Sequence, residues 1–212
     1  MRSLWFMLGL ITFGTAASVA ACDDAADGAG GSGTTSSVSA STQSSTATGL
    51  VSDTQTPPQE AVALEAWLAK GDYKTWKCEL AVHAARMPSP HGFNKICSND
   101  ILSADAAGTG AWKKGAAGVK ELYASETDTT PVGVAVYLKI ADDSAGGNNW
   151  YYYERVPLDS PAPHDAKGVV ADGFGSAGPA KMICVGCHAG AGMDAAHTPT
   201  AGARDFVYTP VP

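Results

Sequence analysis

Positive charge is scarce in this chain. Its 14 Lys and Arg residues are outnumbered by 21 Asp and Glu residues, which gives a formal net charge of −7 at pH 7. The basic residues do not gather into a stripe along the sequence. A surface that binds nucleic acid needs such a stripe to neutralise phosphates. The sequence therefore predicts no nucleic-acid partner.

Long apolar runs are also missing. The run from Leu4 to Phe13 follows Arg2 and is too short to span a bilayer. It leads to the small residues before Cys22, as in a secretory signal peptide, which we predict over residues 1–21. The residues Val19-Ala20-Ala21-Cys22 resemble a bacterial lipobox, and this resemblance implies that Cys22 carries a lipid anchor to a bacterial membrane. An ordinary signal peptide cut after Ala21 would instead leave Cys22 as a free thiol.

Large apolar side chains are nearly absent between the predicted signal and residue 56. This stretch consists mainly of Gly, Ser, Thr and Ala, so it cannot bury enough surface to offset the cost of ordering. We predict a disordered tether over residues 22–56, which holds one folded domain of residues 57–212 away from the membrane. The expected location is extracytoplasmic, in the periplasm.

Cysteine is rare, with five residues, but two of them form the most informative motif of the chain. The sequence Cys184-Val185-Gly186-Cys187-His188 has the Cys-x-x-Cys-His pattern that attaches a c-type haem. The two thiols can form thioethers with the two vinyl groups of one porphyrin, and the adjacent imidazole can bind the iron as proximal ligand. The sequence thus predicts one covalent haem c held by Cys184, Cys187 and His188.

Two other chemistries use a Cys-x-x-Cys pair. A thioredoxin-like redox motif lies in an early strand-to-helix turn, whereas this pair lies near the C-terminus. A structural zinc site needs ligands from a second pair, and the sequence contains no second Cys-x-x-Cys. Both alternatives are therefore less favoured than haem.

The remaining cysteines are Cys78 and Cys97. In an oxidising periplasm, two thiols left over on one small domain usually pair, so we predict a disulfide between them. The alternative is two buried free thiols.

The hydrophobic pattern predicts an α+β fold. Thr56 can cap a helix that begins at Pro57, carries Leu64 and Trp67 at helical spacing, and ends at Gly71. Alternating residues predict a half-buried strand over 132–140, joined by a Gly-rich and Asp-rich loop to a second strand over 150–156 in an antiparallel hairpin. Further strands are expected over 119–123 and 206–208.

An ordered set of short motifs in the folded part resembles the cytochrome P-460 family. These motifs are Ser89-Pro90-His91-Gly92, Asn99-Asp100, Gly118-Val119-Lys120-Glu121-Leu122-Tyr123, Trp150-Tyr151-Tyr152-Tyr153-Glu154, Cys184 to His188 and Asp205-Phe206-Val207-Tyr208. The resemblance implies a single domain with a mostly antiparallel β-sheet, flanking helices, one covalent haem near the C-terminus and usually a homodimer. Enzymes of this family oxidise hydroxylamine, with nitric oxide handled along the way, at a five-coordinate haem cross-linked to a lysine.

Two further site residues follow from the resemblance. Lys120 is the candidate for the cross-linking lysine, and its alternative is a solvated lysine on a strand. Glu154 is the candidate proton acceptor, on the strand face that it shares with Trp150 and Tyr152. For Glu154 the alternative is a pairing with Arg155 or with solvent.

The sequence is consistent with three functions. The first is a haem oxidoreductase acting on a small nitrogen compound. The second is a non-enzymatic protein that binds nitric oxide or carbon monoxide, like the related cytochrome c-prime-beta proteins, whose distal pocket is apolar. The third is electron transfer to a redox partner protein, which a sixth iron ligand from another Met or His would favour. We expect His91 to lie in a turn near the predicted disulfide rather than at the iron.

Overall fold

The computed structural model describes residues 53–86, 89–191 and 203–208. The predicted signal peptide, Cys22 and the tether up to residue 52 lie outside these residues and stay predictions. In the described ranges, no helix combines the length and the apolar character needed to cross a membrane.

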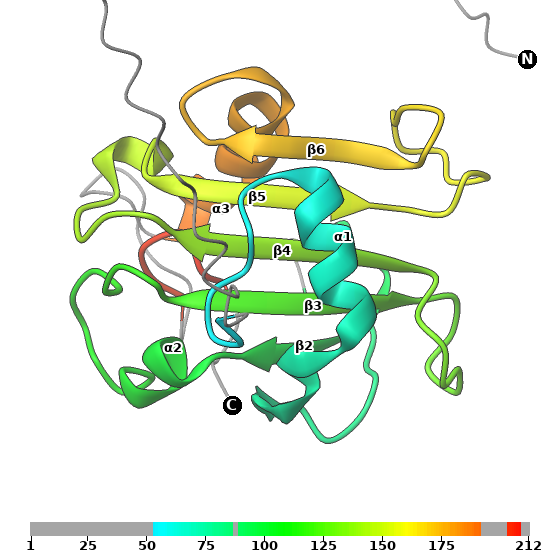
Figure 1. Ribbon diagram of the computed structural model, residues 1–212, viewed down its shortest axis with the longest axis horizontal. Coiled ribbons are helices and arrows are strands. Elements are labelled where there is room, and N and C mark those ends of the chain that lie inside the picture. Colours follow the sequence, from blue (N-terminus) through cyan, green and yellow to red (C-terminus); the bar gives the residue numbers. More distant parts are fainter. Residues whose placement is uncertain (1–52, 87–88, 192–202, 209–212) are drawn as a thin grey trace, which may run out of the picture. The chain divides into compact units, whose positions relative to one another are not determined.

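A six-stranded antiparallel sheet forms the centre of the domain (Figure 1). Each strand pairs with the next one along the chain, in the order β1-β2-β3-β4-β5-β6. Short connections suffice for antiparallel neighbours, so this meander follows from the many turns of the sequence. The strands are β1 (Lys77–Cys78), β2 (Phe93–Ser98), β3 (Ala117–Tyr123), β4 (Gly133–Lys139), β5 (Trp150–Arg155) and β6 (Val169–Phe174). The sheet and its few helices agree with the predicted α+β class.

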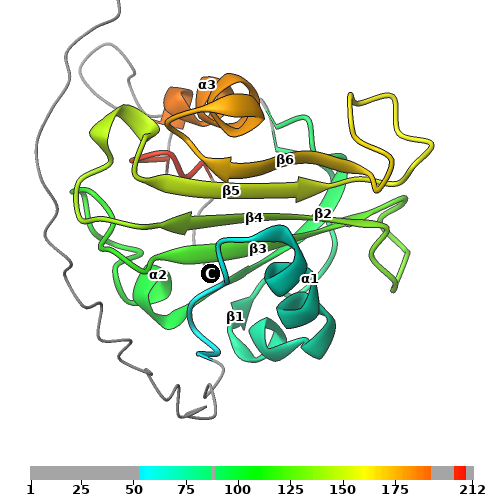
Figure 2. The same ribbon diagram turned by 45° about the horizontal axis from the view of Figure 1, so that its top comes forward.

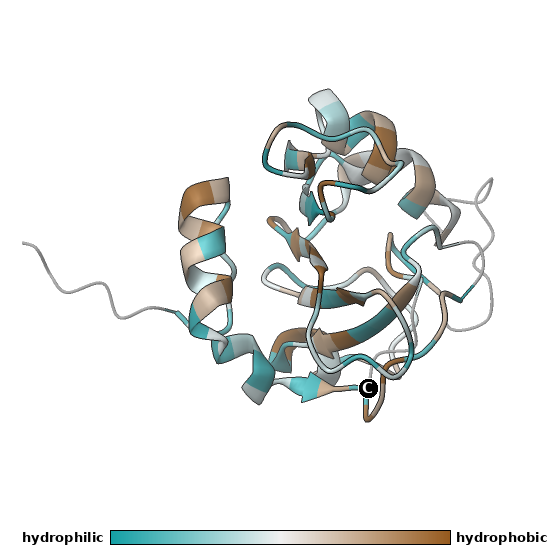
Figure 3. Ribbon diagram, turned by 90° about the vertical axis from the view of Figure 1, so that its right-hand side faces the viewer, coloured by the Kyte–Doolittle hydropathy of each residue, from teal (hydrophilic) through white to brown (hydrophobic). Residues whose placement is uncertain are grey.

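Helical segments cover both faces of this sheet (Figures 2 and 3). One face packs its aliphatic and tyrosine side chains against Leu64 and Trp67 of α1. The other face, with Trp150 and Tyr152, packs against the C-terminal helical run that contains Cys184. The helical elements are α1 (Ala61–Lys70), η1 (Asp72–Thr75), α2 (Asp100–Ala104), η2 (Ala145–Gly147), η3 (Ala180–Val185), α3 (Gly186–His188) and η4 (Ala189–Ala191).

Strand β4 has the predicted period but is not half-buried. Val134 and Val136 lie in the core beneath α1, while Tyr137 of the same strand is buried on the opposite face. The prediction of a solvated face is wrong because a second apolar layer covers that face. The β4–β5 hairpin itself is confirmed, with Tyr137 opposite Tyr152.

Helix α1 begins later than predicted. Glu60 is its N-cap, and the Glu60 carboxylate accepts hydrogen bonds from the Val62 and Ala63 N–H groups at 3.1 and 3.0 Å. Thr56 does not cap it, because Pro58 disfavours helical backbone at the residue before it. The predicted end is correct: Gly71 adopts the left-handed conformation, with φ of 74°, that commonly closes a helix.

Three strands, β1, β2 and β6, are missing from the prediction, and one strand was wrongly assigned. Strand β2 mixes polar and apolar residues, and β6 contains Asp172 and Gly173, so neither shows a clean alternation. Residues 206–208 form no strand; an isolated bridge between Arg204 and Val207 closes a tight turn there.

The predicted disulfide is present. Cys78 and Cys97 face each other directly across β1 and β2, with their Cα atoms 3.9 Å apart. Because β1 has two residues, its backbone pairing alone is weak, and the crosslink fixes this edge of the sheet.

We predict that Cys78→Ala/Cys97→Ala lowers the free energy of unfolding by about 3 kcal/mol, because the crosslink restricts the unfolded chain. Guanidinium denaturation of the oxidised protein measures this difference. Reductant should remove the same stability from the unmodified protein and leave the double variant unchanged. A difference below about 0.5 kcal/mol would contradict the prediction.

Candidate functional site

The Cys-x-x-Cys-His motif lies on one continuous helical run. The π-helical segment η3 leads directly into α3, which contains Cys187 and His188. Residues three and four apart on a helix share a face, so Cys184, Cys187 and His188 are directed to the same side. Cys184 is buried, Cys187 is partly exposed, and neither forms a disulfide. The two thiols are thus free to react with one shared group.

The imidazole of His188 is held in a defined orientation. Its Nδ1 lies 2.6 Å from the backbone carbonyl oxygen of Phe206 and donates a hydrogen bond to it. Desolvation lowers the pKa of His188 to about 4, so the ring is neutral at pH 7. With the proton on Nδ1, Nε2 carries the lone pair that a metal needs.

Three tyrosine rings surround this imidazole. Their centroids lie 5.3 Å (Tyr152), 6.0 Å (Tyr208) and 6.3 Å (Tyr137) from the centroid of the His188 ring. Tyr208 also donates its hydroxyl to the carbonyl oxygen of Cys187 at 2.9 Å. The rings restrict the imidazole and account for its desolvation.

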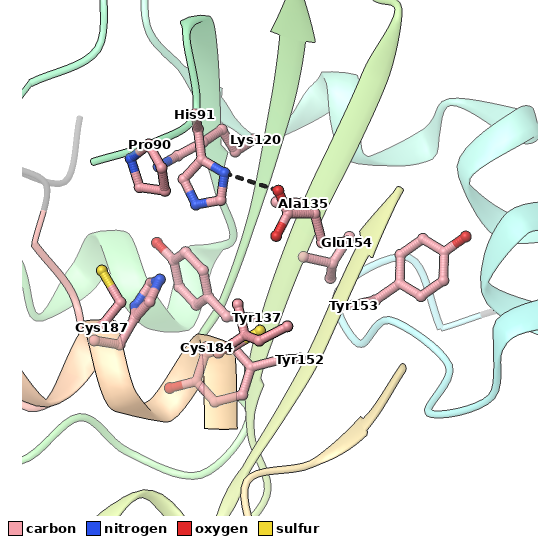
Figure 4. A pocket seen from close by; sticks show the side chains of 13 residues that line it. Pro90, His91, Lys120, Ala135, Tyr137, Tyr152, Tyr153, Glu154, Cys184 and Cys187 are labelled. Atoms are coloured by element: carbon pink, nitrogen blue, oxygen red, sulfur yellow. Dashed lines mark hydrogen bonds and ion pairs between the residues drawn. The ribbon is translucent and has the colours of Figure 1, made fainter. Parts of the chain in front are cut away.

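A small hollow of about 50 Å³, partly open to solvent, lies between the motif and the sheet (Figure 4). Figure 4 shows His91, Lys120 and Glu154 on one side of the hollow and the helix with Cys184 and Cys187 on the other. Its lining comprises Pro90, His91, Lys120, Ala135, Val136, Tyr137, Tyr152, Tyr153, Glu154, Ile183, Cys184, Cys187 and His188.

The register of the sheet brings Lys120 and Glu154 to this hollow. Lys120 of β3 is paired with Ala135 of β4, which is paired in turn with Glu154 of β5. Facing residues of adjacent strands point to the same side, so the lysine and the carboxylate flank the small Ala135 side chain. Burial lowers the pKa of Lys120 to about 8, although the charge of Glu154 counteracts part of this effect. Lys120 is therefore largely desolvated rather than a solvated strand lysine.

His91 belongs to the same group, although the sequence did not predict that it lines the hollow. Its Nδ1 lies 3.1 Å from Oε1 of Glu154, and both side chains are mostly buried. The side-chain amide of Asn94 donates to the carbonyl oxygens of His91 and Gly92, which fixes the chain just before β2. No local sequence signal indicates this contact, because it joins segments 63 residues apart.

The alternative pairing of Glu154 with Arg155 is also not observed. Successive strand residues point to opposite faces, and the Arg155 Nε donates to Glu65 of α1 at 2.7 Å on the other side of the sheet. Glu154 instead shares its face with Trp150 and Tyr152, as predicted.

Two buried hydroxyls next to the motif have no hydrogen-bond partner within the described part of the chain. They belong to Tyr137 and Tyr152, which are 7% and 3% exposed. Leaving a buried hydroxyl unpaired costs about 1–3 kcal/mol, and the Trp67 indole N–H and the Ser98 hydroxyl, which do not line the hollow, are also unpaired among the described residues. Free thiols three residues apart, an imidazole with an available Nε2, apolar walls and unpaired donors together fit a covalent haem.

The other chemistries of a Cys-x-x-Cys pair fit less well. Burial raises the pKa of Cys184 to about 12, whereas a redox-active thiol requires a lowered pKa. Among the described residues, no three His, Cys, Asp or Glu side chains are grouped so that they could chelate a bare metal ion.

Of the Met and His residues other than His91 that could supply a sixth iron ligand, those in the described part of the chain do not line the hollow. His83 contacts Glu79, and His164 contacts the carbonyl oxygen of Asp165; neither lines the hollow. Met182 is largely exposed. Met87, Met193 and His197 lie outside the described residues.

No family model matches this chain, and no curated protein is significantly similar to it. The resemblance to the cytochrome P-460 family therefore stays a prediction from the sequence.

We predict that the Lys120 ammonium of the haem-free chain titrates near pH 8, well below its ordinary value of 10.5. Glu154→Gln should lower this pKa further, because the carboxylate charge stabilises the ammonium. An NMR titration of the lysine amines, assigned with Lys120→Arg, measures both values. Glu65→Gln, on the opposite face, is the control and should leave the pKa of Lys120 unchanged; an ordinary lysine pKa at Lys120 would contradict the prediction.

Proposed function

We propose that this protein is a monohaem c-type cytochrome of the cytochrome P-460 type, which performs redox chemistry on a small nitrogen compound such as hydroxylamine or nitric oxide. The observation that carries the proposal is that the haem-attachment motif and a group of acid–base side chains line the same hollow. A Cys-x-x-Cys-His helix lines one side, and the acid–base group His91–Glu154–Lys120 lines the other.

Three residues would hold the prosthetic group. The thiols of Cys184 and Cys187 would form the thioethers, and Nε2 of His188 would bind the iron. Bound haem supplies a redox-active iron that can take a small ligand. The hydrogen bond from His188 Nδ1 to the Phe206 carbonyl keeps the imidazole in the required tautomer.

The chain itself supplies the acid–base chemistry. Oxidising hydroxylamine releases protons as well as electrons, so the reaction needs a proton acceptor within reach of the substrate. Glu154 is suited to this role, because its carboxylate lines the hollow and His91 can share the accepted proton across a 3.1 Å contact. Lys120 lies beside Glu154 across Ala135 in the strand register and lines the same hollow.

Lys120 could also be the residue that cross-links to the haem. Its lowered pKa gives it a larger fraction of neutral amine near physiological pH than an ordinary lysine has, and the neutral amine is the nucleophilic form. The family resemblance alone suggests the cross-link between Lys120 and haem, and the lowered pKa of Lys120 adds chemical support.

The compartment is part of the same proposal. A structural disulfide such as Cys78–Cys97 persists in oxidising surroundings, which agrees with export and with the predicted lipid on Cys22. We therefore propose a periplasmic protein attached to a membrane through that lipid.

The first experiment is the absorption spectrum of the ferrous protein made in a host with the machinery for haem c attachment, together with mass analysis of its haem peptide. A red-shifted Soret band and a peptide that joins Lys120 to haem would support hydroxylamine oxidation. An ordinary five-coordinate spectrum without the crosslink would favour binding of nitric oxide or carbon monoxide. A six-coordinate spectrum would favour electron transfer, and a chain without haem would refute the whole proposal.

We predict that Glu154→Gln lowers kcat for hydroxylamine oxidation by about 10²-fold or more, because an amide cannot accept the substrate proton. Haem content and spectrum should stay the same. Steady-state oxidation with an artificial electron acceptor measures the effect, and Glu65→Gln is the matched control with a carboxylate removed on the opposite face. Equal rates in the two variants would exclude Glu154 as the proton acceptor.

A further inference from the structure

The segment that binds His188 has an unusual backbone. Asp205 and Phe206 both have positive φ angles, 42° and 68°, although neither is glycine. Such a backbone conformation is strained for a non-glycine residue and persists where surrounding contacts impose it. This strained turn directly precedes and includes the carbonyl group that accepts the His188 hydrogen bond.

A buried ion pair imposes this conformation. Nζ of Lys139, a side chain with no solvent exposure, lies 2.5 Å from Oδ2 of Asp205. The same oxygen accepts a hydrogen bond from the backbone N–H of Trp112 at 2.7 Å. The Ser144 hydroxyl donates to the other carboxylate oxygen. Ser144 in turn accepts the indole N–H of Trp150 at 3.0 Å. The carboxylate thus has donors from three separate parts of the chain.

The neighbouring residues of the turn are fixed as well. The Arg204 guanidinium lies 3.6 Å from the centroid of the Trp112 ring, and it donates to Asp105. Phe206 is 1% exposed and packs against Trp150 at a centroid distance of 6.4 Å. The Phe206 carbonyl therefore cannot turn away from His188 unless the buried network around Asp205 breaks.

We propose that Asp205, held by Lys139 and Ser144, is a positioning residue that sets the tautomer and the ligand strength of His188 through the Phe206 carbonyl. This inference rests on the proposed haem function. A hydrogen bond from Nδ1 raises the basicity of the ligand nitrogen, and a more basic ligand stabilises ferric over ferrous iron. Loss of the network should therefore favour the ferrous state.

The main test compares Ser144→Ala and the double variant Lys139→Met/Asp205→Asn with the unmodified haem protein. The double variant removes both buried charges together, because either charge left alone would threaten folding. Ser144→Ala keeps the ion pair and removes one donor to Asp205. Glu65→Gln breaks a more exposed ion pair, with Arg155, on the opposite face of the sheet and is the control.

We expect the ferrous-to-ferric ratio of the double variant at a fixed applied potential to rise at least tenfold, which corresponds to 59 mV for one electron. The shift should be smaller in Ser144→Ala and absent in Glu65→Gln. Resonance Raman of the ferrous protein should show a lower iron–histidine stretching frequency, which a merely structural role would not produce. Folded variants with unchanged potential and frequency would overturn the proposal.

A second readout separates this inference from the haem proposal. In the haem-free chain, nitrogen NMR of the His188 ring should show a single tautomer with the proton on Nδ1, and a mixture of tautomers in the double variant. If the unmodified protein takes up no haem, the proposed function fails, while this readout still decides the role of Asp205. A mixture of His188 tautomers already in the unmodified chain would refute the proposed role of Asp205.

Discussion

The hydrogen bond from His188 Nδ1 to the Phe206 carbonyl joins the two segments on which the candidate site depends. One is the helical run with both motif cysteines, and the other is the strained turn fixed by Asp205. Both pack on the same sheet face, so the orientation of the imidazole depends on how that face is covered. A ring free to rotate could present either nitrogen to a ligand; this contact selects Nε2.

Both faces of the sheet contain buried polar groups, and only some of these groups are hydrogen-bonded within the described part of the chain. Beneath α1, the Glu121 carboxylate accepts hydrogen bonds from the hydroxyls of Tyr73 and Tyr123, each at 2.6 Å. These two donors stabilise the buried carboxylate. On the motif face, the hydroxyls of Tyr137 and Tyr152 have no partner among the described residues. The indole N–H of Trp67, beneath α1, is likewise unpaired among the described residues, so unpaired groups occur on both faces.

The sequence predicts the features that depend on local chemistry. Alternating residues located β4 and β5 and their hairpin, and cysteine counting located the disulfide. The pattern failed for β2 and β6, whose polar residues break the alternation, and for the start of α1, where Glu60 caps in place of a Ser or Thr. The contact between His91 and Glu154 was not predicted, because it depends on the pairing of distant strands, which no local pattern encodes.

Small residues on the motif face give the hollow its shape. Ala135 lies between Lys120 and Glu154 in the strand register, so a larger side chain there would fill the space that the lysine and the carboxylate line. Gly118 has a similar role beneath Tyr137, since a Cβ atom at that position would lie 2.4 Å from the Tyr137 hydroxyl oxygen. A methyl group there would displace the Tyr137 ring. The register of the strands thus determines which charged side chains meet, and the small residues Ala135 and Gly118 leave room beside them.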